Sequence, residues 1–266
     1  MPEPSPAPSI QALLDVMARL RDPASGCPWD VAQDFASIAR YTVEEAHEVA
    51  DVIQRGPEPG ALLDELGDLL LQVVYHARMA EERGWFAFED VAAGITAKMV
   101  RRHPHVFGDA VVADGPAQTL AWEALKSAER AARAETGALA GVAMALPGLT
   151  RAAKLTARAA RVGFDWPDAP SVLAKLDEEV AELRAELPVA EPARLADELG
   201  DILFVLANLA RKLDLDAERC ITGANAKFER RFSAVEAGLA EAGLSPADAS
   251  LDEMEAQWLK AKQRGL

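Results

Sequence analysis

The sequence is poor in several features that mark common classes of protein. Its two cysteines, Cys27 and Cys220, are far apart and form no C-x-x-C motif, so we expect a reducing compartment and no disulfide scaffold. No apolar run approaches the roughly 20 residues of a membrane-spanning helix, and the best candidate, residues 202–210, is bracketed by charged residues. Residues 1–9 lack the basic and apolar segments of a signal peptide, so we expect a disordered, Pro-rich tail there. These absences favour a cytoplasmic protein.

Basic side chains are also scarce: 28 lysines and arginines stand against 43 aspartates and glutamates, for a formal net charge of −15. A protein that binds the nucleic-acid backbone or anionic lipid needs a basic surface, so neither partner is expected. A ligand that carries phosphates would need a cation between itself and the protein. With 266 residues, 50% of them hydrophobic, the chain can bury the core of one large domain or two small ones.

Hydrophobic residues recur at intervals of three and four along nearly the whole chain, as they do in helices. Clear cases are residues 10–20 and 62–74. Alternating, strand-like segments with hairpin turns are missing from the sequence. The pattern predicts an all-α fold.

Three polar motifs occur twice in the same order, which indicates a duplication. The pairs are Glu45-x-x-Glu48 with Glu179-x-x-Glu182, Asp64-Glu65-Leu66-Gly67-Asp68 with Asp197-Glu198-Leu199-Gly200-Asp201, and Lys98-x-x-Arg101-Arg102 with Lys227-x-x-Arg230-Arg231. Tryptophans flank each set: Trp29 and Trp122 in the first half, Trp166 and Trp258 in the second. We predict two homologous helical domains, at residues 10–135 and 151–266, joined by a linker at 136–150.

The acidic motifs of each half are spaced to face one another. Residues three apart lie on one side of a helix, so each motif presents two carboxylates in the same direction. Strong turn signals, residues 55–60 and 188–192, separate the two motifs of each half. In an antiparallel hairpin folded about these turns, the carboxylates come level in two facing rungs. The predicted quartets are Glu45, Glu48, Glu65 and Asp68, and Glu179, Glu182, Glu198 and Asp201.

Four converging carboxylates repel one another unless cations neutralise them. Ligand sets made only of oxygen select hard ions, so Mg²⁺ or Mn²⁺ is expected. A di-iron site would need Glu-x-x-His on the facing helices, and His47 lies on roughly the opposite face from Glu45. We also expect Leu66-Gly67 and Leu199-Gly200 to be buried, with a neighbouring helix or ligand close to each glycine.

The basic motifs offer partners for phosphate oxygens. Lys227, Arg230 and Arg231 occupy one helical turn beside two phenylalanines, Phe228 and Phe232, that look like core residues. Trp258, followed by Lys262, offers a flat face for a base or sugar, although a core position is the ordinary reading of a single tryptophan. For His103 and His105 we expect a structural or surface role.

These motifs resemble the MazG family of nucleoside triphosphate pyrophosphohydrolases, which are all-α enzymes marked by E-E-x-x-E followed by E-x-x-D. The match covers nearly the whole chain. It includes Glu44-Glu45-x-x-Glu48 with Glu65-x-x-Asp68, Glu178-Glu179-x-x-Glu182 with Glu198-x-x-Asp201, Gly26-Cys27-Pro28-Trp29-Asp30, and Arg101-Arg102-His103-Pro104-His105-Val106-Phe107. The acidic motif alone would support only the broader superfamily, which includes dUTP, dCTP and phosphoribosyl-ATP pyrophosphatases.

The resemblance implies Mg²⁺-dependent hydrolysis of a nucleoside triphosphate to the monophosphate and pyrophosphate, by a dimer or higher homo-oligomer. Carried over by position, it implies that the metal ligands are Glu179, Glu182, Glu198 and Asp201. It implies nucleotide contacts by Lys175, Arg194, Lys227, Arg230, Arg231 and Trp258. In the first half, Glu45, Glu48, Glu65 and Asp68 are the matching metal ligands, and Lys98, Arg101 and Arg102 are candidate phosphate contacts.

The two halves differ in two basic positions. Lys175 corresponds to Tyr41, and Arg194 corresponds to Ala61, so we expect the second half to be the main catalyst. Two other functions stay open: a nucleotide-sensing or partner-binding module with little turnover, and a purely structural helical scaffold. Helical hairpins with one apolar stripe cannot bury themselves, so we expect them to pair into four-helix bundles within or between chains.

Overall fold

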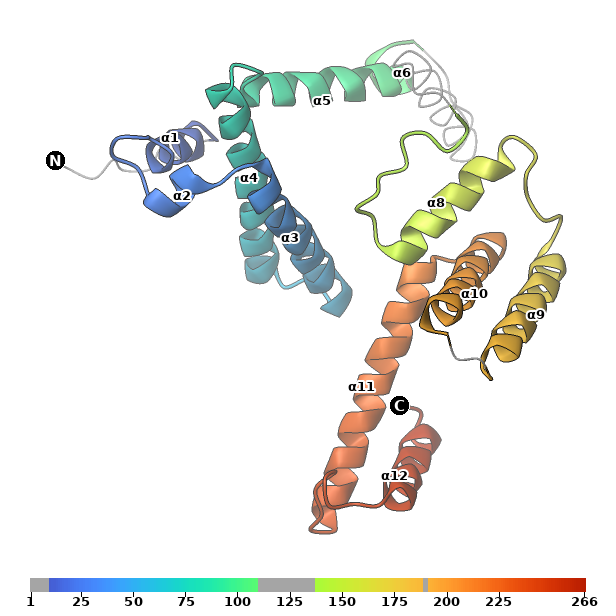
Figure 1. Cartoon of the computed structure of the whole chain (residues 1–266). Helices are drawn as coiled ribbons and strands as arrows, with labels where there is room; N and C mark the ends of the chain where they lie inside the picture. Colours follow the sequence, from blue (N-terminus) through green and yellow to red (C-terminus); the bar gives the residue numbers. More distant parts are fainter. Residues whose placement is uncertain (1–9, 110–136, 189–190) are drawn as a thin grey trace. The chain divides into compact units, whose positions relative to one another are not determined.

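The computed structural model describes residues 10–109, 137–188 and 191–266, and these residues form helices without a strand (Figure 1). The all-α prediction is therefore confirmed. The chain divides into two compact units, Met1–Leu125 and Lys126–Leu266. The division falls among residues 110–136, outside the described residues, as does Trp122, so the domain and linker boundaries stay a prediction. None of the described helices is long and apolar enough to cross a membrane.

The first unit is built around an antiparallel hairpin of two long helices. Its described helices are α1 (Ile10–Leu20), α2 (Pro28–Ala32), α3 (Phe35–Arg55), α4 (Pro59–Glu82), α5 (Phe88–Arg102) and α6 (Pro104–Phe107). The side chain of Asp34 accepts a hydrogen bond from the backbone N–H of Ser37 and begins α3. After α3, Gly56 takes φ of 99°, and the side chain of Glu58 then caps α4. The hairpin turn thus lies where the Pro- and Gly-rich segment predicted it.

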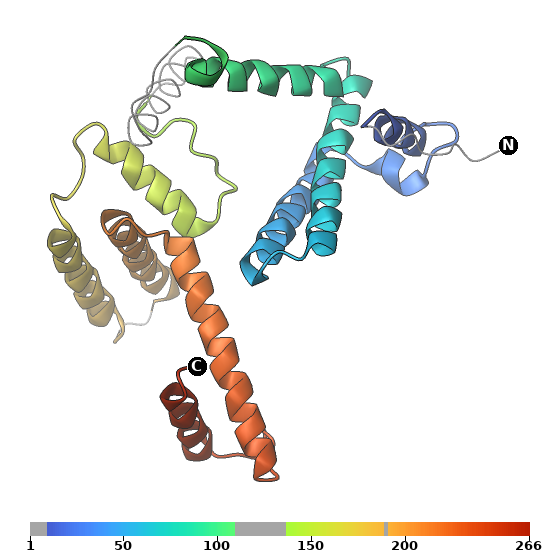
Figure 2. The ribbon, with the colours of Figure 1, turned by 180° about the vertical axis from the view of Figure 1, so that it is seen from behind.

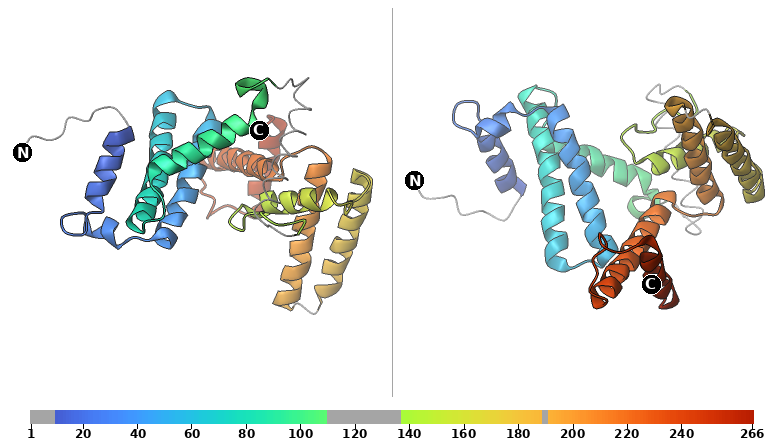
Figure 3. Two further views of the ribbon diagram at one scale, coloured as in Figure 1. Left: turned by 90° about the horizontal axis from the view of Figure 1, so that it is seen from above. Right: turned by 60° about the horizontal axis from the view of Figure 1, so that its bottom comes forward.

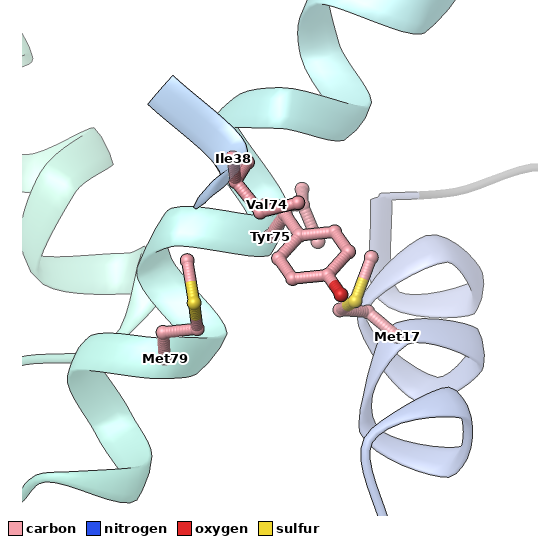
Figure 4. Packing of buried hydrophobic residues seen from close by; sticks show 5 residues of the cluster. All are labelled: Met17, Ile38, Val74, Tyr75 and Met79. Carbon is pink, nitrogen blue, oxygen red and sulfur yellow. The ribbon is translucent and has the colours of Figure 1, made fainter. Parts of the chain in front are cut away.

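The core of the first unit lies at the end of the hairpin remote from this turn. Its buried residues come from α1, from the start of α3 and from the second half of α4: Met17, Ile38, Val74, Tyr75 and Met79 (Figure 4). The part of the hairpin nearer the turn, which carries the acidic motifs, lies outside this cluster.

A buried arginine fastens the segment between α1 and α2 to α4. Arg21 is 8% exposed, and its Nη2 lies 2.8 Å from Oε2 of Glu82. The same guanidinium donates to the carbonyl of Asp30 and lies over the ring of Tyr75, whose hydroxyl donates to that carbonyl at 2.9 Å. Burial raises the pKa of Tyr75 to about 12. The Gly26-to-Asp30 motif therefore has a structural partner in the core of this unit.

The second unit repeats the hairpin and adds a separate pair of helices. Its helices are α8 (Gly148–Ala160), α9 (Ala169–Glu186), α10 (Pro192–Lys212), α11 (Ala217–Glu241) and α12 (Leu251–Gln263). α9 and α10 lie side by side as the hairpin, and α8 packs across α10 (Figures 1 and 2). Small residues where α8 meets α10 and the start of α11, namely Ala152, Ala207 and Ala217, form the buried cluster of this unit. The outer half of α11 extends beyond the hairpin and packs against α12 (Figure 3).

Both hairpins keep an apolar face that no other described helix of their own unit covers. The prediction that Leu66 and Leu199 are buried is wrong, since they are 48% and 49% exposed. A Cβ added at Gly67 or Gly200 would meet no atom within 4 Å, so none of the described helices approaches either glycine closely. The reason is that the core uses only one stripe of each hairpin. The second stripe is left exposed at Leu63, Leu66, Leu70 and Val73, and at Leu199, Leu203, Phe204 and Leu206.

Candidate metal and nucleotide site

The first hairpin brings three carboxylates together from its two helices. Glu45 of α3 and Glu65 and Asp68 of α4 each offer an oxygen, and these oxygens lie within 4.8 Å of one another. Burial raises the pKa of Glu45, and a hydrogen bond with Glu48 and the charge of Asp68 raise it further. Burial and the charge of Glu48 likewise raise the pKa of Glu65. Carboxylates held together against their mutual repulsion are a favourable place for a cation.

The second hairpin forms the corresponding set from Glu179 and Glu182 of α9 and Glu198 of α10. Their oxygens also lie within 4.8 Å of one another, and Glu179 is only 5% exposed. Burial raises the pKa of Glu182, the charge of Glu179 adds to this rise, and the ammonium of Lys175 opposes it. The oxygen-only ligand set fits a hard divalent ion such as Mg²⁺.

The facing arrangement agrees with the predicted rungs, although each compact set holds three of the four predicted carboxylates. The charge of Asp68 raises the pKa of Glu45, and the charge of Glu48 raises the pKa of Glu65, as expected for carboxylates that face one another across the hairpin. Glu48 and Asp201 lie outside the two sets whose oxygens all come within 4.8 Å. The helical spacing therefore predicted the face of each carboxylate, while the side-chain conformations decide which of them converge.

Lys175 and Arg194, the two basic residues that distinguish the second half, are held by acidic neighbours. The ammonium of Lys175 lies 2.8 Å from Oε1 of Glu179 and 2.8 Å from Oε1 of Glu178. Arg194 forms an ion pair with Glu186 across the hairpin turn. Either cation would have to leave its partner to contact a nucleotide.

The first half has aromatic residues at the position of Lys175. Tyr41 lies one turn before Glu45, and its ring centroid lies 6.4 Å from that of Trp29. The guanidinium of Arg40 lies 4.5 Å from the Tyr41 centroid. Trp29 is 53% exposed. This aromatic group was missed from the sequence, where the only signal was that Tyr41 replaces lysine.

The basic cluster of the second half lies on α11, beyond the hairpin. Lys227 and Arg230 are exposed, whereas Arg231 donates from Nε to the carbonyl oxygen of Leu266 at 2.6 Å. Its guanidinium lies 5.7 Å from the ring centroid of Trp258. In the first half, Lys98, Arg101 and Arg102 lie towards the end of α5, which leaves the hairpin at the C-terminal end of α4 (Figure 1).

Trp258 borders an apolar hollow between α11 and α12. The hollow has a volume of about 360 Å³ and is lined mainly by Phe228, Phe232, Leu251, Met254 and Trp258. The rings of Phe228 and Trp258 lie 5.4 Å apart. The expectation that Phe228 is a core residue is wrong for this chain alone, because Phe228 is 57% exposed. An open aromatic surface beside an arginine suits the flat face of a nucleobase.

No histidine of the first half belongs to either carboxylate set. The rings of His103 and His105 are 5.7 Å apart, and Nδ1 of His103 lies 2.7 Å from the carbonyl of Met99 at the end of α5. His76 of α4 contacts the hydroxyl of Thr42 at 2.9 Å. Among the described residues, the clusters able to hold a metal contain only carboxylates.

The two hairpins and the helices that follow them match a known family. Residues 33–107 and 168–235 each match the sequence profile of the MazG nucleotide pyrophosphohydrolase domain. The chain belongs to the MazG family. Both carboxylate sets and the Lys227-to-Arg231 cluster fall inside the matched segments, which together make the tandem form of MazG.

Relatives that align along the full length of this MazG chain are also known. A nucleoside triphosphate pyrophosphohydrolase from Escherichia coli (strain K12) is 46% identical over 257 residues, which cover 96% of this chain and 97% of that protein. The nucleoside triphosphate pyrophosphohydrolase/pyrophosphatase MazG of Thermotoga maritima is 36% identical over 254 residues, 95% of each chain.

Proposed function

We propose that this chain is a Mg²⁺-dependent nucleoside triphosphate pyrophosphohydrolase whose second half is the main catalyst. It hydrolyses nucleoside triphosphates to the nucleoside monophosphate and pyrophosphate. The observation that carries the proposal is the convergence of Glu179, Glu182 and Glu198 on the facing helices of one hairpin. Membership of the MazG family and the names of the full-length relatives support the same reaction.

In the second half, the acidic residues would bind the metal and the basic residues would bind the phosphates. Glu179, Glu182 and Glu198 would hold Mg²⁺, with Asp201 next to them on α10 as the fourth ligand of the family pattern. When bound, the ion neutralises the triphosphate and polarises its phosphoryl oxygens. Lys175 and the exposed Lys227 and Arg230 would donate hydrogen bonds to phosphate oxygens that gain charge during the reaction. The hollow beside Trp258 would hold the base.

We further propose that the working form is a homodimer or a higher homo-oligomer. The uncovered stripe at Leu199, Leu203, Phe204 and Leu206 would pack against the same stripe of a second hairpin as a four-helix bundle. Because the chain is strongly acidic, direct binding to nucleic acid is not proposed. Because its substrate would come from the nucleotide pool, we propose that the enzyme acts in the cytoplasm.

We propose that the first half binds metal but contributes little to catalysis. It keeps the carboxylates, but Tyr41 and Ala61 stand where the second half has Lys175 and Arg194. A nucleotide-sensing module with little turnover is the second candidate. It is favoured for this half alone by Tyr41, which lies one turn before Glu45 and whose ring contacts that of Trp29.

Measuring pyrophosphate and monophosphate release from a panel of nucleoside triphosphates, with and without Mg²⁺, tests the proposal. We expect release that requires Mg²⁺ and falls by about 100-fold or more in Glu198→Gln, because one anionic ligand is lost. The neighbouring Asp197→Asn is the matched control, since Asp197 is exposed and lies outside the carboxylate set. Full activity in Glu198→Gln would refute the metal assignment, and binding without release would favour the sensor. A preference for altered bases would support cleansing of the nucleotide pool.

A further inference from the structure

The two carboxylate sets differ in one neighbouring side chain, which is Lys175 in the second half and Tyr41 in the first. In the second half, the ammonium of Lys175 lies 2.8 Å from Oε1 of Glu179. The Glu179 side chain is 6% exposed and Lys175 is 30% exposed, so Lys175 approaches the most buried carboxylate of the set from its open side. In the first half, the residue one turn before Glu45 is Tyr41, which carries no charge at neutral pH.

This difference between lysine and tyrosine changes the charges that surround the two sets. Around Glu45, the carboxylates of Glu65 and Asp68 place oxygens within 4.8 Å of its own. In the second set, the ammonium of Lys175 lies 2.8 Å from Glu179, whose oxygen lies within 4.8 Å of those of Glu182 and Glu198. Arg40, the neighbour of Tyr41 in sequence, is turned to the ring and hydroxyl of Tyr41. The second set therefore carries a cation of its own, whereas no ion pair among the described residues reaches the first set.

We propose that Lys175 is a tethered counter-ion of Glu179, which a divalent metal displaces and which then binds the phosphates of the nucleotide. This inference rests on the proposed metal role of the carboxylates and adds a coupling between the two ligands of the site. Metal alone must expel the ammonium from Glu179, whereas metal with a triphosphate gives the expelled ammonium a new anionic partner. The second half therefore binds metal and nucleotide cooperatively, and the first half binds metal independently of nucleotide.

Three properties of lysine and of this position support the exchange. A buried carboxylate needs a partner at all times, because leaving it charged and unpaired is strongly unfavourable. The lysine ammonium is a compact charge on a flexible four-carbon stem, so it can leave one oxygen for another nearby without moving the helix. Its second partner, Glu178, is 57% exposed and does not enclose it.

The test measures metal binding by the full chain, with Mn²⁺ as the probe and the electron paramagnetic resonance of free Mn²⁺ as the readout. A Glu65→Gln background disables the first set, so that binding reports the second. We expect α,β-methylene-ATP, which resists cleavage at the α–β bridge, to tighten Mn²⁺ binding by about fivefold or more, within the usual range of coupling between two ligands. In Lys175→Met, Mn²⁺ alone should bind tighter by a similar factor, and the analogue should add little.

Two further variants complete the comparison. Lys260→Met removes the same charge from an exposed position on α12 and should leave Mn²⁺ binding unchanged. Tyr41→Lys, placed in a Glu198→Gln background, should weaken Mn²⁺ binding by the first set. Unchanged or weaker binding of Mn²⁺ alone by Lys175→Met would overturn the counter-ion role. If the chain carrying both Glu65→Gln and Glu198→Gln still bound Mn²⁺ as the wild type does, the metal assignment itself would be wrong.

Discussion

Replacing Arg21 by methionine tests the buried ion pair that holds the start of the first unit together. Methionine keeps much of the aliphatic packing of the arginine and removes its charge and hydrogen bonds. Glu82 would lose its contact with Arg21, and the carbonyl of Asp30 would lose one of its three donors. Removing one partner of a buried ion pair costs about 3–5 kcal/mol. Because Glu82 keeps Arg78 at 3.0 Å, we expect a smaller loss, about 2–3 kcal/mol of unfolding free energy.

The same variant has a predictable dependence on pH. Burial alone would raise the pKa of Glu82, but hydrogen bonds and charge from Arg21 and Arg78 outweigh it and hold the pKa below its usual value. A carboxyl with a lowered folded-state pKa stabilises the fold above its unfolded pKa, and that stability is lost as the pH falls through the folded value. The stability difference between wild type and Arg21→Met should therefore be largest at neutral pH and shrink below about pH 4.

Urea unfolding followed by circular dichroism measures this difference, and hydrogen exchange of peptides from α1 and α4 assigns it to the first unit. Arg19→Met is the matched control, because Arg19 is an exposed arginine at the end of α1, two residues before Arg21. If Arg21→Met matched Arg19→Met within about 0.5 kcal/mol, the ion pair would contribute no more than an ordinary surface pair, and the argument from burial would fail.

Two further predictions concern the second unit. Trp258→Leu should raise KM for nucleoside triphosphates by about tenfold or more, with a smaller effect on kcat, because stacking on a base is lost. Steady-state kinetics measure this change, with Trp85→Leu at an exposed tryptophan as the control. An unchanged KM would show that the base does not bind in this hollow. Leu203→Lys should shift the chain towards monomers in sedimentation velocity, while Asp197→Lys on the same helix should not; a dimer that tolerates lysine at residue 203 would exclude this stripe from the interface.

Much of the hairpin geometry could be predicted because its causes are local. Proline and glycine between α3 and α4 determine where the chain turns, and carboxylates three residues apart lie on one helical face. The convergence of Glu45 with Asp68 follows from their equal distance from the turn. The i, i+4 spacing of Lys175 and Glu179 was visible in the sequence as well, but Lys175 was interpreted only as a nucleotide contact.

Other features depend on contacts that the sequence does not encode locally. Arg21 and Glu82 are 61 residues apart, so no periodicity pairs them. The apolar residues Leu66 and Leu199 look like core because a hydrophobic pattern marks a stripe without showing what covers it. Phe228 was misjudged for the same reason: it is 57% exposed, on a helix, α11, that extends beyond the hairpin (Figure 3).

The position of the divalent ion is the most direct test of the account. Crystals of the full chain grown with Mn²⁺ and α,β-methylene-ATP would give an anomalous signal at the metal. The account predicts Mn²⁺ among the oxygens of Glu179, Glu182 and Glu198, with the ammonium of Lys175 turned from Glu179 to a phosphate oxygen. Nucleotide bound in the second half with no Mn²⁺ at these three carboxylates would contradict it.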